Sequence, residues 1–241
     1  MAPRRTTLVI DGNHLAFRSF YKMGQLRSSK GVESGAVFGA LRTLRTLLIR
    51  FNPRAVVAVF DGKAVKQKSL LESYKGHRDP KMETFYKQVK DIRRVFRALG
   101  VPCVRDPESE ADPIISALAG HLAQIAKQKV IIVSSDSDFY QCLENGILQY
   151  DAIRDRTISK QVVLKKYDLR DLNQVMLMKA IMGDRSDNIP PVKRGVGPKT
   201  AIKIIKSHEQ YMTFAHENHK ALKRNVALVM LPRDLGHSGE R

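Results

Sequence analysis

The chain has 241 residues, 43% of them hydrophobic, which is enough for a substantial core in one domain or slightly more. Its 42 Lys and Arg residues against 24 Asp and Glu residues give a formal net charge of +18, which favours nucleic acid or another anionic partner. No apolar run approaches the ~20 residues that a membrane span needs, and no signal-peptide stretch is found at the start. The two cysteines exclude a disulfide framework and a zinc site built from Cys, so we expect an intracellular protein.

Short β-branched runs predict strands buried on both faces, because they lack the polar alternation of half-exposed strands. Helical periodicity falls between these runs and after them. The alternation predicts an α/β fold, with a central, mainly parallel sheet and helices on both faces. The strands are expected at 7–10, 55–60, 129–134 and 147–150, and the helices at 36–50, 114–126, 171–182 and after 206. Polar connectors are expected between the strand at 147–150 and residue 170. We divide the chain into an α/β core, residues 1–170, and a helical region, residues 171–241.

Aspartates follow three of the expected strands at their carboxyl ends: Asp11, Asp61, and the pair Asp136 and Asp138. In open α/β sheets this edge is where ligands bind. Each aspartate alone is readily explained as a helix N-cap or a turn residue. Four together would repel each other unless cations lay between them, so the sequence predicts a metal site at this edge.

Two further acidic groups extend this pattern. Glu110 and Asp112 precede the expected helix 114–126, where Asp112 before Pro113 also suits an N-cap with proline at the first helical position. A capping role does not exclude metal ligation, since a carboxylate has two oxygens. Asp184 and Asp187 are three residues apart, one helical turn, which predicts that both carboxylates face one point.

The segment 62–98 is rich in Lys and Arg, interleaved with aromatic residues such as Tyr74, Phe85 and Tyr86. One interpretation is a solvated helical surface. The other is a lid that follows a phosphate backbone and offers aromatic rings for base stacking. Its position directly after the strand-end Asp61 favours the lid.

A glycine turn at 195–200 opens another expected helix, and the free backbone N–H groups at such a helix start favour phosphate. Several flanking side chains are cationic. Together with the lid, this turn supplies the expected DNA contacts: Tyr74, Lys193, Arg194, Gly195, Gly197, Lys199, Thr200 and Lys203.

In this order, the motifs resemble those of the 5′-nuclease superfamily, which includes the flap endonucleases and the 5′–3′ exonuclease domain of bacterial DNA polymerase I. The resemblance is carried by residues 9–13, 59–62, 74–78, 110–112, 135–138, 182–190 and 195–201. It implies a PIN-like fold, a helical arch at 62–98, and a helix–three-turn–helix (a form of helix-hairpin-helix) around 195–200. It also implies a structure-specific 5′ nuclease that acts in DNA replication or repair.

By the same resemblance, two Mg²⁺ or Mn²⁺ ions would drive hydrolysis. One ion would be held by Asp11, Asp61, Glu110 and Asp112, and the other by Asp136, Asp138, Asp184 and, less directly, Asp187. Lys75, Arg78 and Arg18 would act on the scissile phosphate. The resemblance further implies a potassium ion at the 195–200 hairpin, as in some relatives. The partner would be branched or 5′-flapped DNA, with no membrane. We expect a monomer in the cytoplasm of a bacterial or phage-infected cell.

Pro113 is the one departure from the pattern, because bacterial and phage relatives usually carry a second aspartate directly after Glu-Ala-Asp. This leaves open an alternative, a DNA-structure binding protein with weakened catalysis. An RNA-cutting nuclease of the PIN type shares the strand-end aspartates. It has no reason to carry the glycine hairpin or the Tyr-Lys-x-x-Arg segment.

Overall fold

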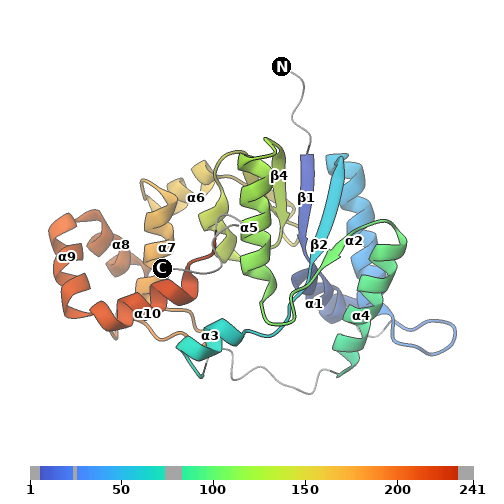
Figure 1. Ribbon diagram of the computed structural model, residues 1–241, viewed down its shortest axis with the longest axis horizontal. Coiled ribbons are helices and arrows are strands. Elements are labelled where there is room, and N and C mark those ends of the chain that lie inside the picture. The colour runs from blue at the N-terminus through green and yellow to red at the C-terminus, as the bar shows by residue number, and fades with distance from the viewer. Residues whose placement is uncertain (1–5, 24–25, 74–82, 233–241) are drawn as a thin grey trace.

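A six-stranded sheet forms the centre of the computed structural model, which describes residues 6–23, 26–73 and 83–232 (Figure 1). The strand order is β3-β2-β1-β4-β5-β6. Neighbouring strands are parallel except β6, which pairs antiparallel with β5. The mainly parallel sheet predicted from the sequence is therefore confirmed. Its strands are β1 (Thr6–Asp11), β2 (Ala55–Val59), β3 (Cys103–Val104), β4 (Lys129–Val133), β5 (Ile147–Asp151) and β6 (Arg156–Ile158).

Helices cover both faces of the sheet, which explains why its strands read as continuous apolar runs. Leu8 and Ile10 of β1 face a cluster formed with α1 (Gly12–Met23), α2 (Gly35–Phe51) and α4 (Glu83–Ala98). Val9 faces the opposite cluster, which contains α5 (Ala111–Gln124). All three side chains are completely buried, so successive residues of one strand supply two separate cores.

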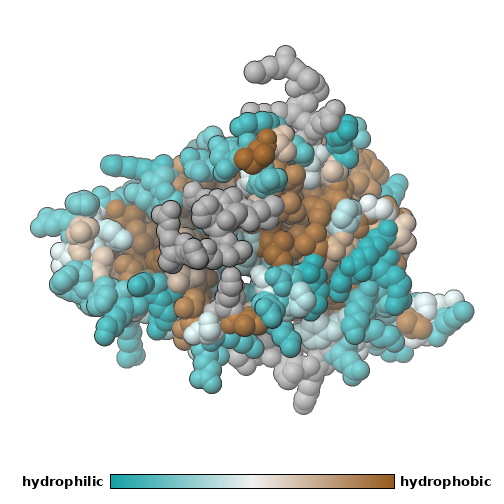
Figure 2. Space-filling model, viewed as in Figure 1, coloured by the Kyte–Doolittle hydropathy of each residue, from teal (hydrophilic) through white to brown (hydrophobic). Residues whose placement is uncertain are grey.

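The remaining helices lie mostly beside the sheet, where α7 to α10 form a lobe and α3 lies against α10 (Figure 1). On the face shown in Figure 2, hydrophilic residues lie along the outer rim of this lobe. No helix in the described ranges is long and apolar enough to cross a membrane. The helices of the described ranges whose bounds are not given above are α3 (Val65–Leu70), the 3₁₀ helix η1 (Ser137–Cys142), α6 (Lys160–Tyr167), α7 (Leu172–Met182), α8 (Pro198–Lys206), α9 (His208–Glu217) and α10 (His219–Val229).

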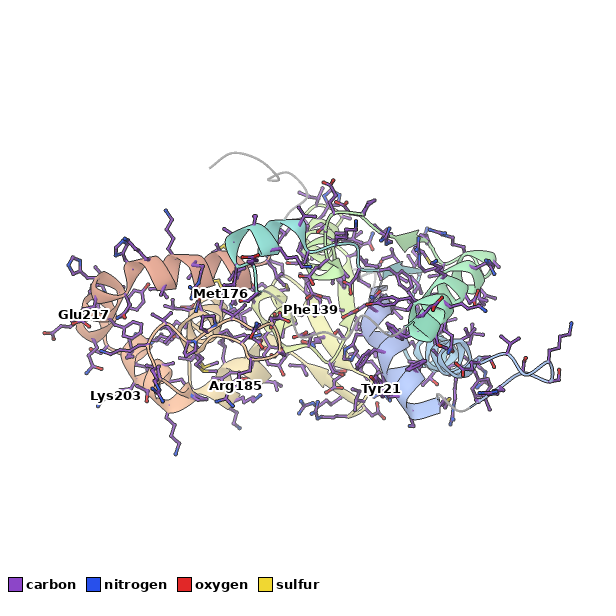
Figure 3. The ribbon with its side chains drawn as sticks, turned by 90° about the horizontal axis from the view of Figure 1, so that it is seen from below. Tyr21, Phe139, Met176, Arg185, Lys203 and Glu217 are labelled. Carbon is purple, nitrogen blue, oxygen red and sulfur yellow. The ribbon has the colours of Figure 1, made fainter. Side chains whose placement is uncertain are left out.

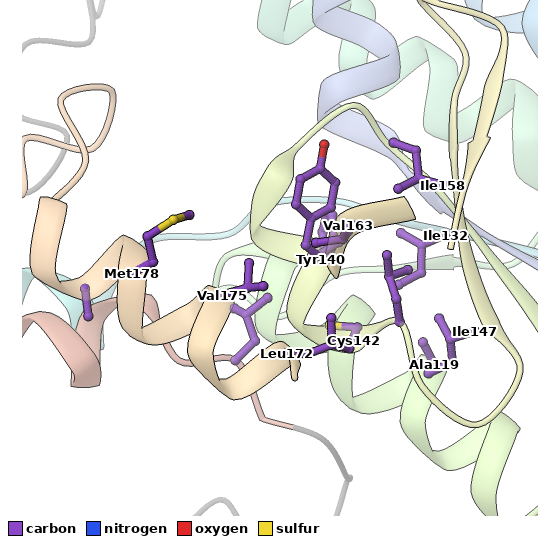
Figure 4. Close-up of a cluster of buried hydrophobic side chains, with 14 of the residues drawn as sticks. Ala119, Ile132, Tyr140, Cys142, Ile147, Ile158, Val163, Leu172, Val175 and Met178 are labelled. Carbon is purple, nitrogen blue, oxygen red and sulfur yellow. The ribbon is translucent and has the colours of Figure 1, made fainter. Parts of the chain in front are cut away.

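Helix α7 joins the lobe to the sheet through apolar side chains. Leu172, Val175 and Met178 are buried in one cluster with Tyr140 and Cys142 of η1 (Figure 4). The same cluster reaches the sheet and α8. The division of the chain after residue 170 stays a prediction.

The four expected strands and the helices at 36–50, 114–126 and 171–182 are confirmed, with ends that differ by at most three residues. The prediction of polar connectors between the strand at 147–150 and residue 170 was wrong, because this stretch contains β6 and α6. The sequence reasoning also missed β3 and α1. Two-residue and three-residue strands such as β3 and β6 are too short to show a periodicity.

Helix α4 corrects one expectation for the basic segment 62–98. Phe85, predicted to offer a ring for base stacking, is 5% exposed and belongs to the core that also contains Ile92 and Phe96. Tyr86, on the other face of the helix, is 52% exposed and can still contact a base. One face of α4 therefore packs against the core. Residues 74–82 lie outside the described part, so the helical arch at 62–98 stays a prediction.

The side chain of Asn225 connects α10 by hydrogen bonds to α7 and to the loop that follows α7. Its side chain is completely buried, and its Nδ2 donates to the carbonyl oxygens of Ala180 at 2.9 Å and Pro190 at 2.8 Å. Asn225→Ala should lower the free energy of unfolding by about 2–4 kcal/mol, because the carbonyls of Ala180 and Pro190 both lose a donor and the variant leaves a small cavity. Urea denaturation measures this, with the exposed Lys223→Ala on the same helix as control. Equal stability of the two variants would show that Asn225 does not fasten the helix.

Candidate metal centre and nucleic-acid interface

The strand-end aspartates come together because β1, β2 and β4 are parallel neighbours whose carboxyl ends share one edge. Asp11 is the last residue of β1, Asp61 follows β2, and Asp136 follows β4. The charges of Asp61 and Asp136 both raise the pKa of Asp11, as expected for carboxylates at short range. The predicted gathering of these three side chains is thus present.

Asp11, at this acidic edge, is a buried residue and is 6% exposed. It accepts hydrogen bonds from the backbone N–H of His14 at 2.9 Å and from the Ser134 hydroxyl at 3.0 Å. Burial, followed by the charge of Asp61, raises its pKa to about 7. A cation beside Asp11 would offset both effects, so this half of the site is suited to a metal ion.

Asp61 brings the acidic residues of α5 to the end of β2. Its carboxylate accepts the backbone N–H of Ala111 at 2.8 Å, and its own backbone N–H donates to Asn13 at 3.2 Å. Glu110 is the N-cap residue of α5 and is buried, and Asp112 lies in the first turn. The expectation that Asp112 caps the helix was therefore wrong, because the helix and its N-cap lie two residues earlier than expected.

Gln149 of β5 stabilises the turn after β4 through side-chain hydrogen bonds. Its buried amide donates to the carbonyl oxygens of Ser134 at 2.8 Å and Asp136 at 2.7 Å. Asp136 then caps η1 by accepting the backbone N–H of Asp138 at 2.9 Å. One oxygen of Asp136 is used in the cap, which leaves the other for a cation. The capping and metal-binding roles considered for the aspartates are compatible here.

Asp138, Asp184 and Asp187 form a second acidic group, with one oxygen of each within 4.8 Å of the others. The predicted proximity of Asp184 and Asp187 is confirmed, but the predicted helical turn between them is wrong. They lie in a tight loop closed by two backbone hydrogen bonds between Asp184 and Ile189, of 2.9 and 2.7 Å. Helix α7 has already ended, with Gly183 as its C-cap.

Asp184 differs from Asp11 in its electrostatic surroundings. Burial by itself would raise its pKa, but hydrogen bonds from Ser186 and the charge of Lys179 outweigh this and hold the pKa below its ordinary value. The Ser186 backbone N–H and hydroxyl both donate to Asp184 Oδ1, at 2.7 and 2.5 Å. Asp184 is therefore an anion at neutral pH, with Oδ2 directed toward Lys179 at 3.8 Å.

Several residues that position the site were missed in the sequence. Asn13, Ser134 and Gln149 orient the aspartates through hydrogen bonds, and no spacing rule marks them. Asp151 carried the same signal as the others, because it directly follows the expected strand 147–150. Asp151 is buried and accepts hydrogen bonds from Ser135 and Arg154. Burial by itself would raise the pKa of this carboxyl group, but the hydrogen bonds outweigh it and lower the pKa to about 2. We assign Asp151 a structural role.

The structure describes only some of the cationic candidates. Arg18 of α1 lines a cavity of about 190 Å³ between α1 and α2. Along the molecule, Arg185 beside Asp184 lies between Lys203 on α8 and Tyr21 on α1 (Figure 3). Tyr74, Lys75 and Arg78 lie outside the described residues.

The predicted glycine turn does open a helix. Gly197 is the N-cap of α8, Pro198 is its first residue, and Gly195 has a φ of 84° that suits glycine. The side chains on the loop and the following turns are exposed. These are Lys193, Arg194, Lys199, Thr200 and Lys203. Their contact with DNA, and the assignment of the segment as a helix–three-turn–helix, stay predictions.

Residues 6–168 match the family described as "5′-3′ exonuclease, N-terminal resolvase-like domain". Over 232 residues the chain is 31% identical to a 5′-3′ exonuclease of Aquifex aeolicus, covering 93% of this chain and 79% of that protein. It is 34% identical over 205 residues to the thermostable DNA polymerase I of Thermus thermophilus, covering 85% of this chain. The match spans only 24% of that polymerase.

Solved structures share the fold at lower identity. T5 5′-exonuclease with bound zinc ions superposes with a TM-score of 0.78 at 23% identity, covering 95% of this chain and 90% of that one. A complex of bacteriophage T5 flap endonuclease with DNA and metal ions gives a TM-score of 0.76 at 23% identity, covering 93% and 89%.

Proposed function

The chain belongs to the 5′–3′ exonuclease family, and from this premise we propose that it is a structure-specific 5′ nuclease that hydrolyses phosphodiesters with two divalent metal ions. The observation that carries the proposal is the acidic edge itself. Asp11, Asp61 and Asp136 meet where the parallel strands end, and Asp138, Asp184 and Asp187 form a second group within 4.8 Å. Such a concentration of carboxylates needs cations to be stable.

The donor set fits hard divalent cations, because it consists of carboxylate oxygens. We assign Asp11, Asp61, Glu110 and Asp112 to one ion, and Asp136, Asp138, Asp184 and Asp187 to the other. The raised pKa of Asp11 supports the first group, since an anion there lacks a counter-charge. Pro113 is accommodated as the third residue of α5, so it leaves the helix start intact.

Bound Mg²⁺ or Mn²⁺ would activate a water molecule and stabilise the charge that develops on the phosphate. The protein's own residues hold the acidic ligands in place through the hydrogen bonds of Asn13, Ser134 and Ser186. Lys75, Arg78 and Arg18 would place cationic groups beside the scissile phosphate, where negative charge builds up during hydrolysis.

The substrate we propose is duplex DNA with a free 5′ single strand. The exposed cations of the 193–203 segment would hold the duplex, with α8 offering its free N–H groups to a phosphate. Asn188, in the acidic loop, donates to the carbonyl of Ser73 at 2.8 Å. The loop that holds Asp184 is thereby connected to a residue of the proposed arch. A potassium ion at 195–200, a monomeric state and a cytoplasmic location remain parts of the proposal.

A labelled 5′-flap duplex tests this function. We expect cleavage near the junction of single strand and duplex in Mg²⁺ or Mn²⁺, none in chelator, and products with a 5′-phosphate. Lys75→Ala should lose cleavage rate far more than DNA affinity, because its charge acts on the reacting phosphate. Lys129→Ala is the matched control, since Lys129 is exposed at the amino end of β4, on the opposite edge of the sheet.

The rival function gives a different result. A DNA-structure binding protein would bind the flap tightly yet leave it uncut in either metal. Loss of binding without loss of rate in Lys75→Ala would contradict the role assigned to that lysine. Binding itself should weaken steeply with salt, since the net charge of +18 favours contacts to phosphates.

A further inference from the structure

Lys179 reaches from α7 into the second acidic group. Its side chain is 13% exposed, and its ammonium forms an ion pair with Asp138 Oδ1. The ammonium lies 3.8 Å from Asp184 Oδ2 and 3.5 Å from the Ser137 hydroxyl. The protein thus places a cation of its own between two of the three carboxylates proposed to hold a metal ion.

Asp138, Asp184 and Asp187 carry three formal negative charges in one small group, and the ammonium of Lys179 lies against two of these carboxylates. A divalent cation placed among the same oxygen atoms would lie close to this ammonium, and the two cations would repel each other.

We propose that Lys179 is a built-in counter-ion of the Asp138–Asp184–Asp187 group, and that a divalent cation binds there only by displacing its ammonium. This inference rests on the proposed function, because it concerns the same metal site. A cation that must displace an ion pair gains less free energy than it would gain from the same carboxylates without that pair. Lys179 therefore weakens the binding of a divalent ion at this group.

Lys179→Met tests the counter-ion directly, because methionine is unbranched and uncharged. Titration of the whole chain with Mn²⁺, followed by calorimetry, should show that the variant binds one Mn²⁺ ion about tenfold more tightly than the wild type does. Without metal the variant should melt at a lower temperature than the wild type, and Mn²⁺ should raise its Tm by more.

Two further variants separate charge from folding. Lys160→Met removes the ion pair of Lys160 with Glu144, 3.0 Å long and outside the site, and should leave Mn²⁺ binding unchanged. Lys179→Arg keeps the positive charge and should bind Mn²⁺ as the wild type does. Unchanged or weaker Mn²⁺ binding in Lys179→Met would overturn the counter-ion and would mean that Lys179 instead holds Asp138 in place.

The same titration distinguishes this inference from the proposed function. A wild-type protein that binds Mn²⁺ and cuts the flap, combined with a Lys179→Met variant that binds no more tightly, overturns the counter-ion alone. A wild-type protein that neither binds Mn²⁺ nor cuts overturns both.

Discussion

Asp184→Asn should lower the rate of flap cleavage by about a thousandfold or more, because one anionic ligand of the metal site is replaced by a neutral amide. The variant should fold, since an Asn Oδ1 can still accept the hydrogen bonds that Ser186 donates to Asp184. Its affinity for DNA should change little, because the basic surface supplies most of the binding. Single-turnover cleavage and a separate binding titration measure the two effects.

Asp91→Asn is the matched control for this change. Asp91 lies on α4 and pairs with Arg94 at 3.2 Å, so its replacement removes a carboxylate outside the metal site. Cleavage by this control should stay close to that of the wild type. A fast Asp184→Asn enzyme would show that the loop after α7 takes no part in the chemistry.

Gly183→Ala should both destabilise the protein and displace the acidic loop. Gly183 has φ 70° and ψ −175°, a region that glycine alone adopts readily. A Cβ at this position would also overlap the carbonyl oxygen of Ile189 and the backbone of Pro190. We expect a loss of roughly 3 kcal/mol in the free energy of unfolding, together with weaker metal binding, because Asp184 is the next residue.

Gly100→Ala separates backbone strain from steric overlap. Gly100 also has a positive φ, of 79°, but a Cβ there meets nothing within 4 Å. This control should lose only about 1 kcal/mol and keep its metal affinity. If Gly183→Ala were no more harmful than Gly100→Ala in chemical denaturation and Mn²⁺ titration, close packing of the loop would not determine the position of Asp184.

The strand-end aspartates could be predicted because parallel strands bring their carboxyl ends to one edge regardless of how far apart they lie in the chain. Asp11, Asp61 and Asp136 needed only a correct identification of three short apolar runs. Asp184 and Asp187 were placed together for the wrong reason. Their spacing fits a helical turn, but Gly183 ends α7 first, and a tight loop brings the carboxylates together instead.

Helix α1 was missed because its apolar residues do not form a clear helical period. Its buried face consists of small or medium residues such as Leu15, Ala16 and Ser19, while the large Phe17 and Tyr21 are 49% and 65% exposed. The apolar pattern is therefore blurred, because aromatic residues lie outside the core face. Lys179 and Gln149 were missed for another reason. Their roles depend on which elements meet in space, and neither composition nor spacing records that.

The most direct test of the two-ion site is an anomalous difference map from crystals of the wild-type protein soaked in Mn²⁺. We predict two peaks about 4 Å apart at the carboxyl edge of the sheet. One should lie among Asp11, Asp61, Glu110 and Asp112, and the other beside Asp138 and Asp184. A map with no peak at this edge, or with peaks only elsewhere on the molecule, would contradict the assignment of these carboxylates as metal ligands.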